Sequence, residues 1–224
     1  MMGYQEVIKQ LTLQKILPLF YHEDEKTSIH IVQALYEAGI RSIEYTNRGE
    51  YALTNFKSLK KRVASEWPGL QLGIGTIKNI TQAKEFIDAG ADYIICPTTN
   101  VEVATEVRAA GLMWIPGCMT PTEISNAEEA GAKLVKIFPG NILGPGYINS
   151  IKELFPGLLF MPTGGVENEK ENLAAWFRAG VIAVGMGSKL LTKALVDKND
   201  YEGIKQHVKG AMKLAAETSG AFIK

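Results

Sequence analysis

The sequence predicts an α/β protein built as a parallel (β/α)8 barrel. Short apolar runs typical of buried strands alternate along the chain with longer stretches of helical periodicity. Eight such strand-helix units fit a barrel, although 224 residues is slightly below its typical size of about 250. Four helical stretches also end in one form, an Ala-Gly pair followed within a few residues by a strand: Ala38-Gly39, Ala89-Gly90, Ala130-Gly131 and Ala179-Gly180. An open, doubly wound sheet is the alternative, and it rarely needs eight units in so short a chain.

The first half of the chain supplies five of the expected strands. An amphipathic stretch at 4–11 opens the chain, and each strand is then a run of branched and aromatic residues. Glycines and one Pro-Gly pair end the helices between the strands, while Asn100 can cap the last of them. The expected strands lie at 16–20, 40–46, 70–76, 92–96 and 112–116, and the helices at about 24–38, 51–66, 80–89 and 100–110.

The second half repeats the pattern. Thr120 can cap a helix that has Pro121 at its first position and Glu123 in its first turn. The remaining strands are expected at 133–138, 158–162 and 181–185, with a short helix near 147–154. Ser188 runs straight into Lys189-Leu190-Leu191, which predicts a further helix starting there.

Composition favours one soluble domain over residues 1–224, with an N-terminal helix at about 2–12 and packing helices at about 195–224. The chain is 46% hydrophobic with a formal net charge of zero, so it lacks the basic excess of a nucleic-acid binder. No apolar run approaches the roughly 18 to 20 residues that cross a bilayer, and no secretory leader is recognisable. We therefore expect a cytoplasmic protein with neither a nucleic-acid nor a membrane partner.

Cysteine and histidine usage bears on redox and metal chemistry. Cys96 and Cys118 both lie in apolar, strand-like runs, so reduced core cysteines are favoured over a disulfide. The three histidines, His22, His30 and His207, show no paired metal-ligand spacing. The sequence predicts no metal site.

Lys136 is the most unusual residue of the predicted strands. It lies in the run 132–140 among branched and aromatic residues, just before Pro139-Gly140 ends the strand. A buried ammonium is destabilised, so a lysine in such a place tends to lose its proton, and a neutral amine attacks carbonyl groups. Lys136 is thus a candidate nucleophile near the carboxyl end of its strand, where barrel enzymes carry their active sites.

Glu44 is the candidate partner of this amine. If Val135 and Ile137 face the helices, strand alternation points Lys136 into the barrel, and the same rule points Glu44 inward. The pair can supply an amine and an acid/base group. A structural Lys-Glu ion pair inside the barrel is the alternative on this pattern alone.

Two glycine-rich loops follow the last two strands, at 162–166 and 185–188. Small residues let backbone N–H groups approach an anion, and barrel enzymes commonly bind phosphate at these two loops. Arg48, just past the second strand, and Thr76, at the end of the third, are candidates for holding a carboxylate. For Arg48 an ordinary surface position is the alternative.

These motifs together resemble the 2-keto-3-deoxy-6-phosphogluconate (KDPG)/4-hydroxy-2-oxoglutarate (KHG) aldolase family. The resemblance runs in order over nearly the whole chain, and the order and spacing make it specific. The segments that carry it are 43–48, 73–76, 115–117 with 120–123, 136–139, 161–166 and 184–188. It implies a class I aldolase, a homotrimer of (β/α)8 barrels that needs no metal and no cofactor besides the covalent Schiff base with its substrate.

The resemblance also implies residue roles. Lys136 matches the Schiff-base lysine and Glu44 the general acid/base. Arg48, Thr76 and Thr163 match positions that hold the substrate carboxylate, and Gly164, Gly165 and Ser188 match phosphate-binding positions, to which Gly187 of the second loop is added. Phe138 matches an aromatic residue beside the imine, and Pro97 a proline that shapes the pocket.

The implied reaction is cleavage of 2-dehydro-3-deoxy-6-phosphogluconate to pyruvate and glyceraldehyde 3-phosphate, with 4-hydroxy-2-oxoglutarate, which gives pyruvate and glyoxylate, as a further substrate. The chain departs from the family pattern at Asn47, Ile74, Thr98 and Gly140. All but Ile74, which faces outward, line the mouth, so an aldolase for an epimeric, galactonate-type acid is an alternative. A non-catalytic phosphosugar-binding barrel is the alternative from another class. A phosphate-binding decarboxylase barrel is disfavoured because the Asp-x-Lys run usual in such enzymes is absent beside Lys136.

Overall fold

Parallel strands and helices alternate along the chain in a computed structural model, which describes residues 3–220. The strands are β1 (Ile16–Phe20), β2 (Ser42–Thr46), β3 (Gln71–Gly75), β4 (Tyr93–Ile95), β5 (Met113–Ile115), β6 (Gly117–Cys118), β7 (Leu134–Ile137), β8 (Leu159–Pro162) and β9 (Val184–Met186). The helices are α1 (Tyr4–Gln14), α2 (Glu25–Ala38), α3 (Ala52–Glu66), α4 (Ile80–Asp88), α5 (Val101–Ala109), α6 (Pro121–Glu129), α7 (Gly140–Ile151), α8 (Lys170–Ala179), α9 (Lys193–Asp197) and α10 (Tyr201–Gly220). The predicted α/β class is confirmed.

The strands form two parallel sheets, one in the order β5-β4-β3-β2-β1-β9 and one in the order β6-β7-β8. The strand expected at 112–116 is divided into β5 and β6 at Pro116, whose missing N–H interrupts the ladder. Lys136 N donates to Pro116 O at 2.8 Å across this break. An isolated pairing of Thr163 with Gly185 links the far ends of the two sheets.

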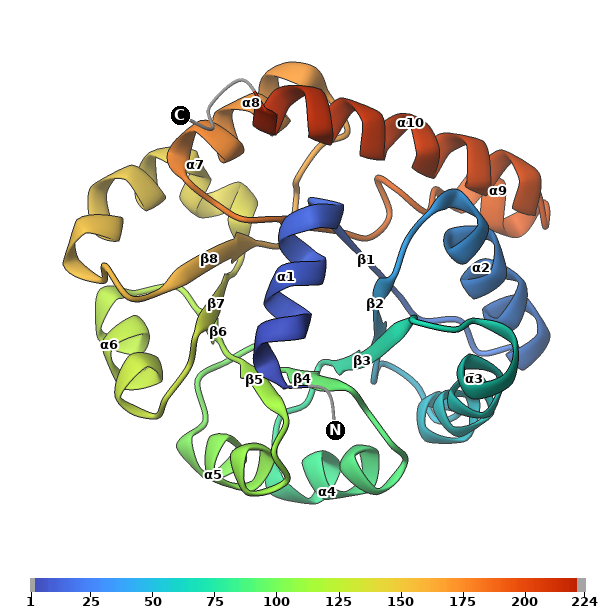
Figure 1. The fold of residues 1–224 in the computed structure, drawn as a ribbon, viewed down its shortest axis with the longest axis horizontal. Coiled ribbons are helices and arrows are strands. Elements are labelled where there is room, and N and C mark those ends of the chain that lie inside the picture. The colour runs from blue at the N-terminus through green and yellow to red at the C-terminus, as the bar shows by residue number, and fades with distance from the viewer. Residues whose placement is uncertain (1–2, 221–224) are drawn as a thin grey trace.

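Helices cover the outer side of the strands. In Figure 1 the strands curl around α1, and the other helices form the outer layer. Two apolar clusters follow from this arrangement. The larger packs the outer strand faces against the helices, and the smaller joins Val7 and Leu11 of α1 to inward residues such as Leu134 and Met161.

Local sequence signals explain where four of the helices begin. Asp24, Asn79 and Asn100 cap α2, α4 and α5 through their side chains. Thr120 and Glu123 form a complete capping box on α6, as the sequence predicts.

One predicted helix start is wrong, and one predicted helix has an additional turn before it. The short helix expected near 147–154 is present as the part of α7 after the non-helical Gly144, together with a 3-10 turn at Lys152–Leu154. The additional turn begins at Gly140, where Pro139 and the backbone of the 163–164 loop hold it. The helix expected at Ser188 is a turn in which the N–H groups of Leu190 and Leu191 both donate to Gly187 O at 2.9 Å. Helix α9 starts only at Lys193, where Thr192 caps it.

The terminal helices fall close to their predicted places. The N-terminal helix is α1, and the C-terminal helices are α9 and α10, of which α10 packs against α2 and α8. Residues 1–2 and 221–224 of the predicted ranges lie outside the described residues. Within 3–220 no helix is both long and apolar enough to span a bilayer.

Candidate active site

Lys136 and Glu44 face each other in the interior. Lys136 lies on β7 and Glu44 on β2, and the lysine Nζ is 3.7 Å from the glutamate Oε1. Lys136 is 4% exposed and Glu44 is fully buried, whereas Lys133 at the start of the same strand is exposed. Both carboxylate oxygens of Glu44 lack a hydrogen-bond partner within residues 3–220. The predicted juxtaposition of these two side chains is confirmed.

Strand alternation explains why these two side chains point inward. Leu134, two residues before Lys136, belongs to the inner cluster, and Val135 and Ile137 belong to the outer one. Ile43 and Tyr45 flank Glu44 and also pack outward against the helices. A buried pair that is not within hydrogen-bond distance is an unfavourable arrangement for stability alone, because desolvation is poorly compensated.

Two inward glycines on β3 make room for this interior. A Cβ atom at Gly75 would overlap the carboxylate of Glu44, and one at Gly73 would overlap the ring of Tyr93. Tyr93 belongs to the inner apolar cluster, and its hydroxyl donates to Ile43 O at 2.9 Å. Burial raises the pKa of Tyr93, so its phenol stays protonated and uncharged.

Cys96, just after β4, belongs to the outer apolar cluster. Burial raises the pKa of its thiol to about 11, partly offset by the indole N–H of Trp114, which lies 3.3 Å from the sulfur, and by the charge of Lys136. The thiol is therefore protonated at neutral pH. Cys96 and Cys118 are both free and buried, in agreement with the prediction of reduced core cysteines.

Arg48 and Thr76 lie together at the mouth. Arg48 is exposed just beyond β2, and its Nε is 3.5 Å from the hydroxyl of Thr76, which follows β3. Thr76 has φ of 63°, an uncommon left-handed conformation for a threonine. An exposed guanidinium beside a hydroxyl held by local backbone strain is well suited to bind a carboxylate.

Thr163 and the first glycine loop follow β8. Thr163 is 5% exposed, its hydroxyl lacks a hydrogen-bond partner within residues 3–220, and it lies against the backbone of Gly185. Gly164 and Gly165 have φ of 91° and 70°, which side-chain-bearing residues rarely adopt. The start of α7 holds this loop, since Asn141 N donates to Gly164 O at 2.8 Å.

The second glycine loop lies on a cleft of about 300 Å³. Gly187 and Ser188 line this cleft together with Arg48. Residues predicted to bind the phosphate and a residue predicted to bind the carboxylate therefore line the same cleft. Gly164 and Gly165 are not among the described residues that line it. Because the helix expected at Ser188 is a turn, the donors that this loop offers are the Ser188 hydroxyl and the backbone N–H groups before Leu190, since those of Leu190 and Leu191 already bond to Gly187 O.

Phe138 lies near the amine of Lys136, and Pro97 lies against β6, the strand that pairs with β7. The Nζ of Lys136 lies 5.4 Å from the centre of the Phe138 ring. The carbonyl of Pro97, after β4, lies against Gly117, which pairs with Lys136 in the β6–β7 register. A larger residue at position 117 would push these strands apart.

Sequence reasoning missed two residues of this interior. Gly75 is needed for the placement of Glu44, and only the register of β2 with β3 shows it. Thr46 shares the inward face of Glu44, is fully buried, and has a hydroxyl without a hydrogen-bond partner within residues 3–220. Alternation from Glu44 was the signal that could have identified it.

The arrangement offers an amine, a carboxylate and hydroxyls without hydrogen-bond partners among residues 3–220, all in one buried interior. Such groups can form and resolve an imine with a ketone, since the amine attacks and the carboxylate moves protons. Within the described range, no three histidine, cysteine, aspartate or glutamate side chains come together as a metal site.

Comparison with known proteins gives a consistent result. The model of the family described as KDPG and KHG aldolase matches residues 7–207. A 2-dehydro-3-deoxy-phosphogluconate aldolase of Pseudomonas aeruginosa is 29% identical over 205 residues, covering 91% of this chain and 90% of its own. A 2-dehydro-3-deoxy-6-phosphogalactonate aldolase of Escherichia coli is 38% identical over 120 residues, covering 53% of this chain and 58% of its own.

Solved structures agree with the sequence comparisons. The crystal structure of a 4-hydroxy-2-oxoglutarate/phosphogluconate-type aldolase is 30% identical with a TM-score of 0.80, covering 93% of this chain and 98% of that one. A structure described as native KDPGal is 26% identical with a TM-score of 0.82, covering 92% of this chain and 96% of that one. Since the family model spans most of the chain and these folds superpose over nearly all of it, the chain belongs to the KDPG and KHG aldolase family.

Proposed function

We propose that the protein is a class I aldolase that cleaves 2-dehydro-3-deoxy-6-phosphogluconate through a Schiff base on Lys136. The observation that carries the proposal is the buried pair of Lys136 and Glu44, with 3.7 Å between Nζ and Oε1 and no hydrogen bond to either carboxylate oxygen within residues 3–220. Family membership supports the same chemistry. A structural ion pair, the alternative on sequence alone, would be better stabilised by closer contacts than these.

The reaction begins when the amine nitrogen of Lys136 attacks the C2 ketone of the substrate. Loss of water gives an imine, and Glu44 moves the protons of that step. Glu44 then removes the proton of the C4 hydroxyl, the C3–C4 bond breaks, and its electron pair is taken up by the protonated imine as an enamine. The C4 fragment leaves as glyceraldehyde 3-phosphate. Protonation of the enamine at C3 and hydrolysis of the imine release pyruvate and the free amine.

The remaining side chains position the substrate in this proposal. Arg48, Thr76 and Thr163 hold the carboxylate, and Gly164, Gly165, Gly187 and Ser188 surround the phosphate. Phe138 packs beside the imine, and Pro97 shapes the wall after β4. The exposed Arg48 next to Thr76, and the unpartnered hydroxyl of Thr163, support these roles.

The choice of substrate has a second candidate. Relatives named for the galactonate-type acid match over part of the chain, one of them at 38% identity, so cleavage of the epimeric substrate is the alternative. Cleavage of 4-hydroxy-2-oxoglutarate is a further proposed activity. The gluconate-type and galactonate-type phosphorylated acids differ in configuration at C4. Comparing the cleavage rates of these two acids decides which one is the substrate.

Two structural proposals accompany the function. We infer that the two sheets form one closed (β/α)8 barrel, supported by the hydrogen bond from Lys136 N to Pro116 O and the Thr163–Gly185 pairing. The protein is a cytoplasmic homotrimer in this proposal, as the family resemblance implies.

Borohydride trapping tests the proposed function. Pyruvate and borohydride are added to the protein, and peptide mass spectrometry locates the reduced adduct. The adduct is expected on Lys136 in the wild type and in the Lys133→Met control, and is expected to be lost in Lys136→Met. An unmodified wild-type protein, or an adduct on another lysine, would overturn the Schiff-base proposal.

A further inference from the structure

The cleft that contains Arg48 and Ser188 is also lined by His22. It lies at the carboxyl ends of β1, β2 and β9, and Tyr21, His22 and Lys193 contribute to its walls. In the proposed function Arg48 holds the substrate carboxylate and Ser188 the phosphate. A side chain on the wall of the same cleft is therefore close to groups that bind the two anionic ends of the substrate, and it can contact one of them.

The main chain of His22 is held by a buried polar network. Its carbonyl oxygen accepts hydrogen bonds from Ser28 Oγ at 3.1 Å, Tyr45 OH at 2.9 Å and Asn55 Nδ2 at 3.1 Å. These three donors come from α2, β2 and α3, and each residue is 3% exposed or less. Three elements of the scaffold thus converge on one carbonyl in the loop after β1.

The ring of His22 is oriented as well. Asp24 N donates to His22 Nδ1 at 3.1 Å, in the turn where Asp24 also caps α2. An Nδ1 that accepts a hydrogen bond carries no proton, so the proton of the neutral ring is on Nε2. Nε2–H has no protein partner within residues 3–220, and because His22 lines the cleft, this N–H is available to a ligand bound there.

The charge of the cleft favours an anion as the acceptor. Arg48 is an exposed cation, while Lys193 and Asp197 neutralise each other in an ion pair at 2.6 Å. The net positive charge among these groups comes from Arg48. An oriented donor on such a wall is suited to a phosphate oxygen, because hydrogen bonds to charged groups are stronger than those between neutral groups.

We propose that His22 is a specificity-determining residue that donates its Nε2–H to the phosphate of the substrate. The inference rests on the proposed aldolase function and adds a residue that neither the glycine loops nor the carboxylate site includes. The network around its carbonyl pre-organises the loop, so that little ordering is needed on binding.

The test compares two substitutions at position 22. His22→Asn keeps a short acceptor for Asp24 N–H but cannot reach into the cleft, and His22→Gln places an amide donor near the position of Nε2. We expect the KM for the phosphorylated acid to rise about tenfold in His22→Asn, as for the loss of one hydrogen bond to a charged group, and to be largely restored in His22→Gln. The pyruvate concentration that half-saturates borohydride trapping should not change, because pyruvate carries no phosphate.

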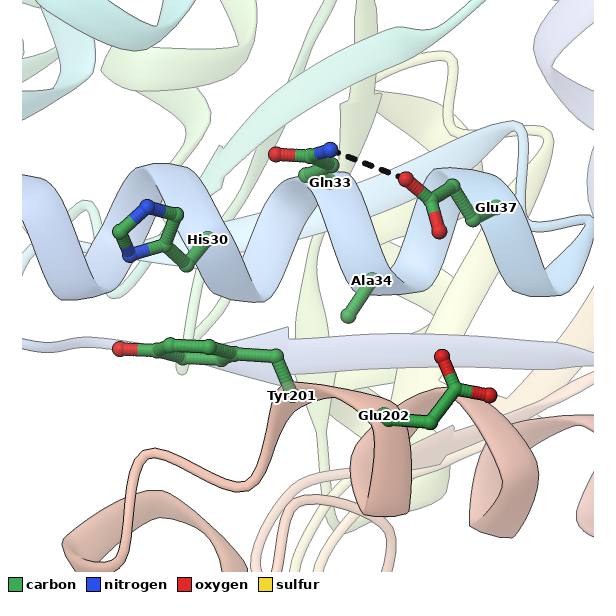
Figure 2. A pocket seen from close by; sticks show the side chains of 6 residues that line it. All are labelled: His30, Gln33, Ala34, Glu37, Tyr201 and Glu202. Carbon is green, nitrogen blue, oxygen red and sulfur yellow. Dashed lines mark hydrogen bonds between the residues drawn. The ribbon is translucent and has the colours of Figure 1, made fainter.

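His30 provides the matched control. Figure 2 shows it on α2, where its ring lies against that of Tyr201, with centroids 4.8 Å apart, and both residues line a separate hollow of about 230 Å³ between α2 and α10. His30→Asn should leave both the KM and the trapping unchanged. An unchanged KM in His22→Asn would overturn the inference, as would a parallel rise in KM and in half-saturating pyruvate, which would indicate a general structural defect. Failure of the wild type to trap pyruvate is a separate result that would overturn the proposed function and this inference with it.

Discussion

The carboxylate of Glu44 lies against the backbone of Gly75, and a single added Cβ atom at position 75 would overlap Oε1. In the β2–β3 register Glu44 is paired with Gly73 and Thr46 with Gly75, so the glutamate side chain extends along β3 toward the mouth. β3 thereby leaves space for Glu44 to approach Lys136. The position of the proposed acid/base group therefore depends on a residue without a side chain.

Gly75→Ala is predicted to displace Glu44 and to remove most of the activity. A positioned general acid/base contributes about 10²- to 10⁴-fold to a rate, and we expect a fall in kcat of about 100-fold or more. Overpacking a dense interior should also lower the free energy of unfolding by about 1–3 kcal/mol. Steady-state kinetics and urea unfolding measure the two effects.

Gly210→Ala is the matched control for this substitution. Gly210 lies within α10, and a Cβ atom there would meet nothing within 4 Å. The change should leave kcat unaltered and raise stability by up to about 1 kcal/mol through helix propensity. Wild-type kinetics in Gly75→Ala would contradict the role assigned to this close approach.

Glu44→Gln is predicted to separate imine formation from turnover. The amide keeps the shape of the side chain and can still pack against Gly75, but it cannot accept the proton of the C4 hydroxyl. We expect kcat to fall by about 10²- to 10⁴-fold, while pyruvate trapping on Lys136 continues at a reduced rate. Full turnover in this variant would remove Glu44 from the mechanism.

Much of this site could be predicted from strand alternation. Lys136 and Glu44 follow from it because a strand with one helix-facing set of branched residues leaves the other set inward. Burial also separates Lys136 from the exposed Lys133, as their opposite facing predicts. Position at a strand end and side-chain period are local properties, and local properties can be read from one sequence.

Features that depend on contacts between distant segments could not be predicted in this way. The approach of Gly75 to Glu44 needs the β2–β3 register, and the three donors on the His22 carbonyl come from three separate elements. The helix expected at Ser188 is wrong because the apolar residues after it close a turn onto Gly187 instead. The apolar side chains of Leu190 and Leu191 indicate that these residues are buried. They do not distinguish a buried turn from a helix.

The two cysteines are predicted to be unreactive in the folded protein. Burial raises the pKa of both the Cys96 and the Cys118 thiols to about 11, against an ordinary value of about 8.5. Native protein at pH 8 should therefore react with iodoacetamide much more slowly than protein unfolded in urea, and mass spectrometry measures both rates.

The burial of the thiols also makes stability depend on pH. Between about pH 8.5 and 11 the thiols ionise in the unfolded protein but not in the folded one. The contribution of the thiols to stability is therefore complete below about pH 8.5 and is lost as the pH rises toward 11. Native-state alkylation as fast as in urea would contradict the burial of the thiols.

Tyr45→Phe is predicted to destabilise the fold, and Tyr147→Phe is its matched control. The hydroxyl of Tyr45 donates to His22 O at 2.9 Å from a fully buried side chain, and its removal should lower the free energy of unfolding by about 1–2 kcal/mol. The hydroxyl of Tyr147 is also buried but lacks a hydrogen-bond partner within residues 3–220, so its removal should be neutral or stabilising. Because the Tyr45 bond holds the loop of His22, the same variant should also raise the KM for the phosphorylated acid without changing pyruvate trapping. Urea unfolding of the two variants gives the first comparison, and equal stability losses would show that the hydroxyl of Tyr45 contributes no more than an unpaired one.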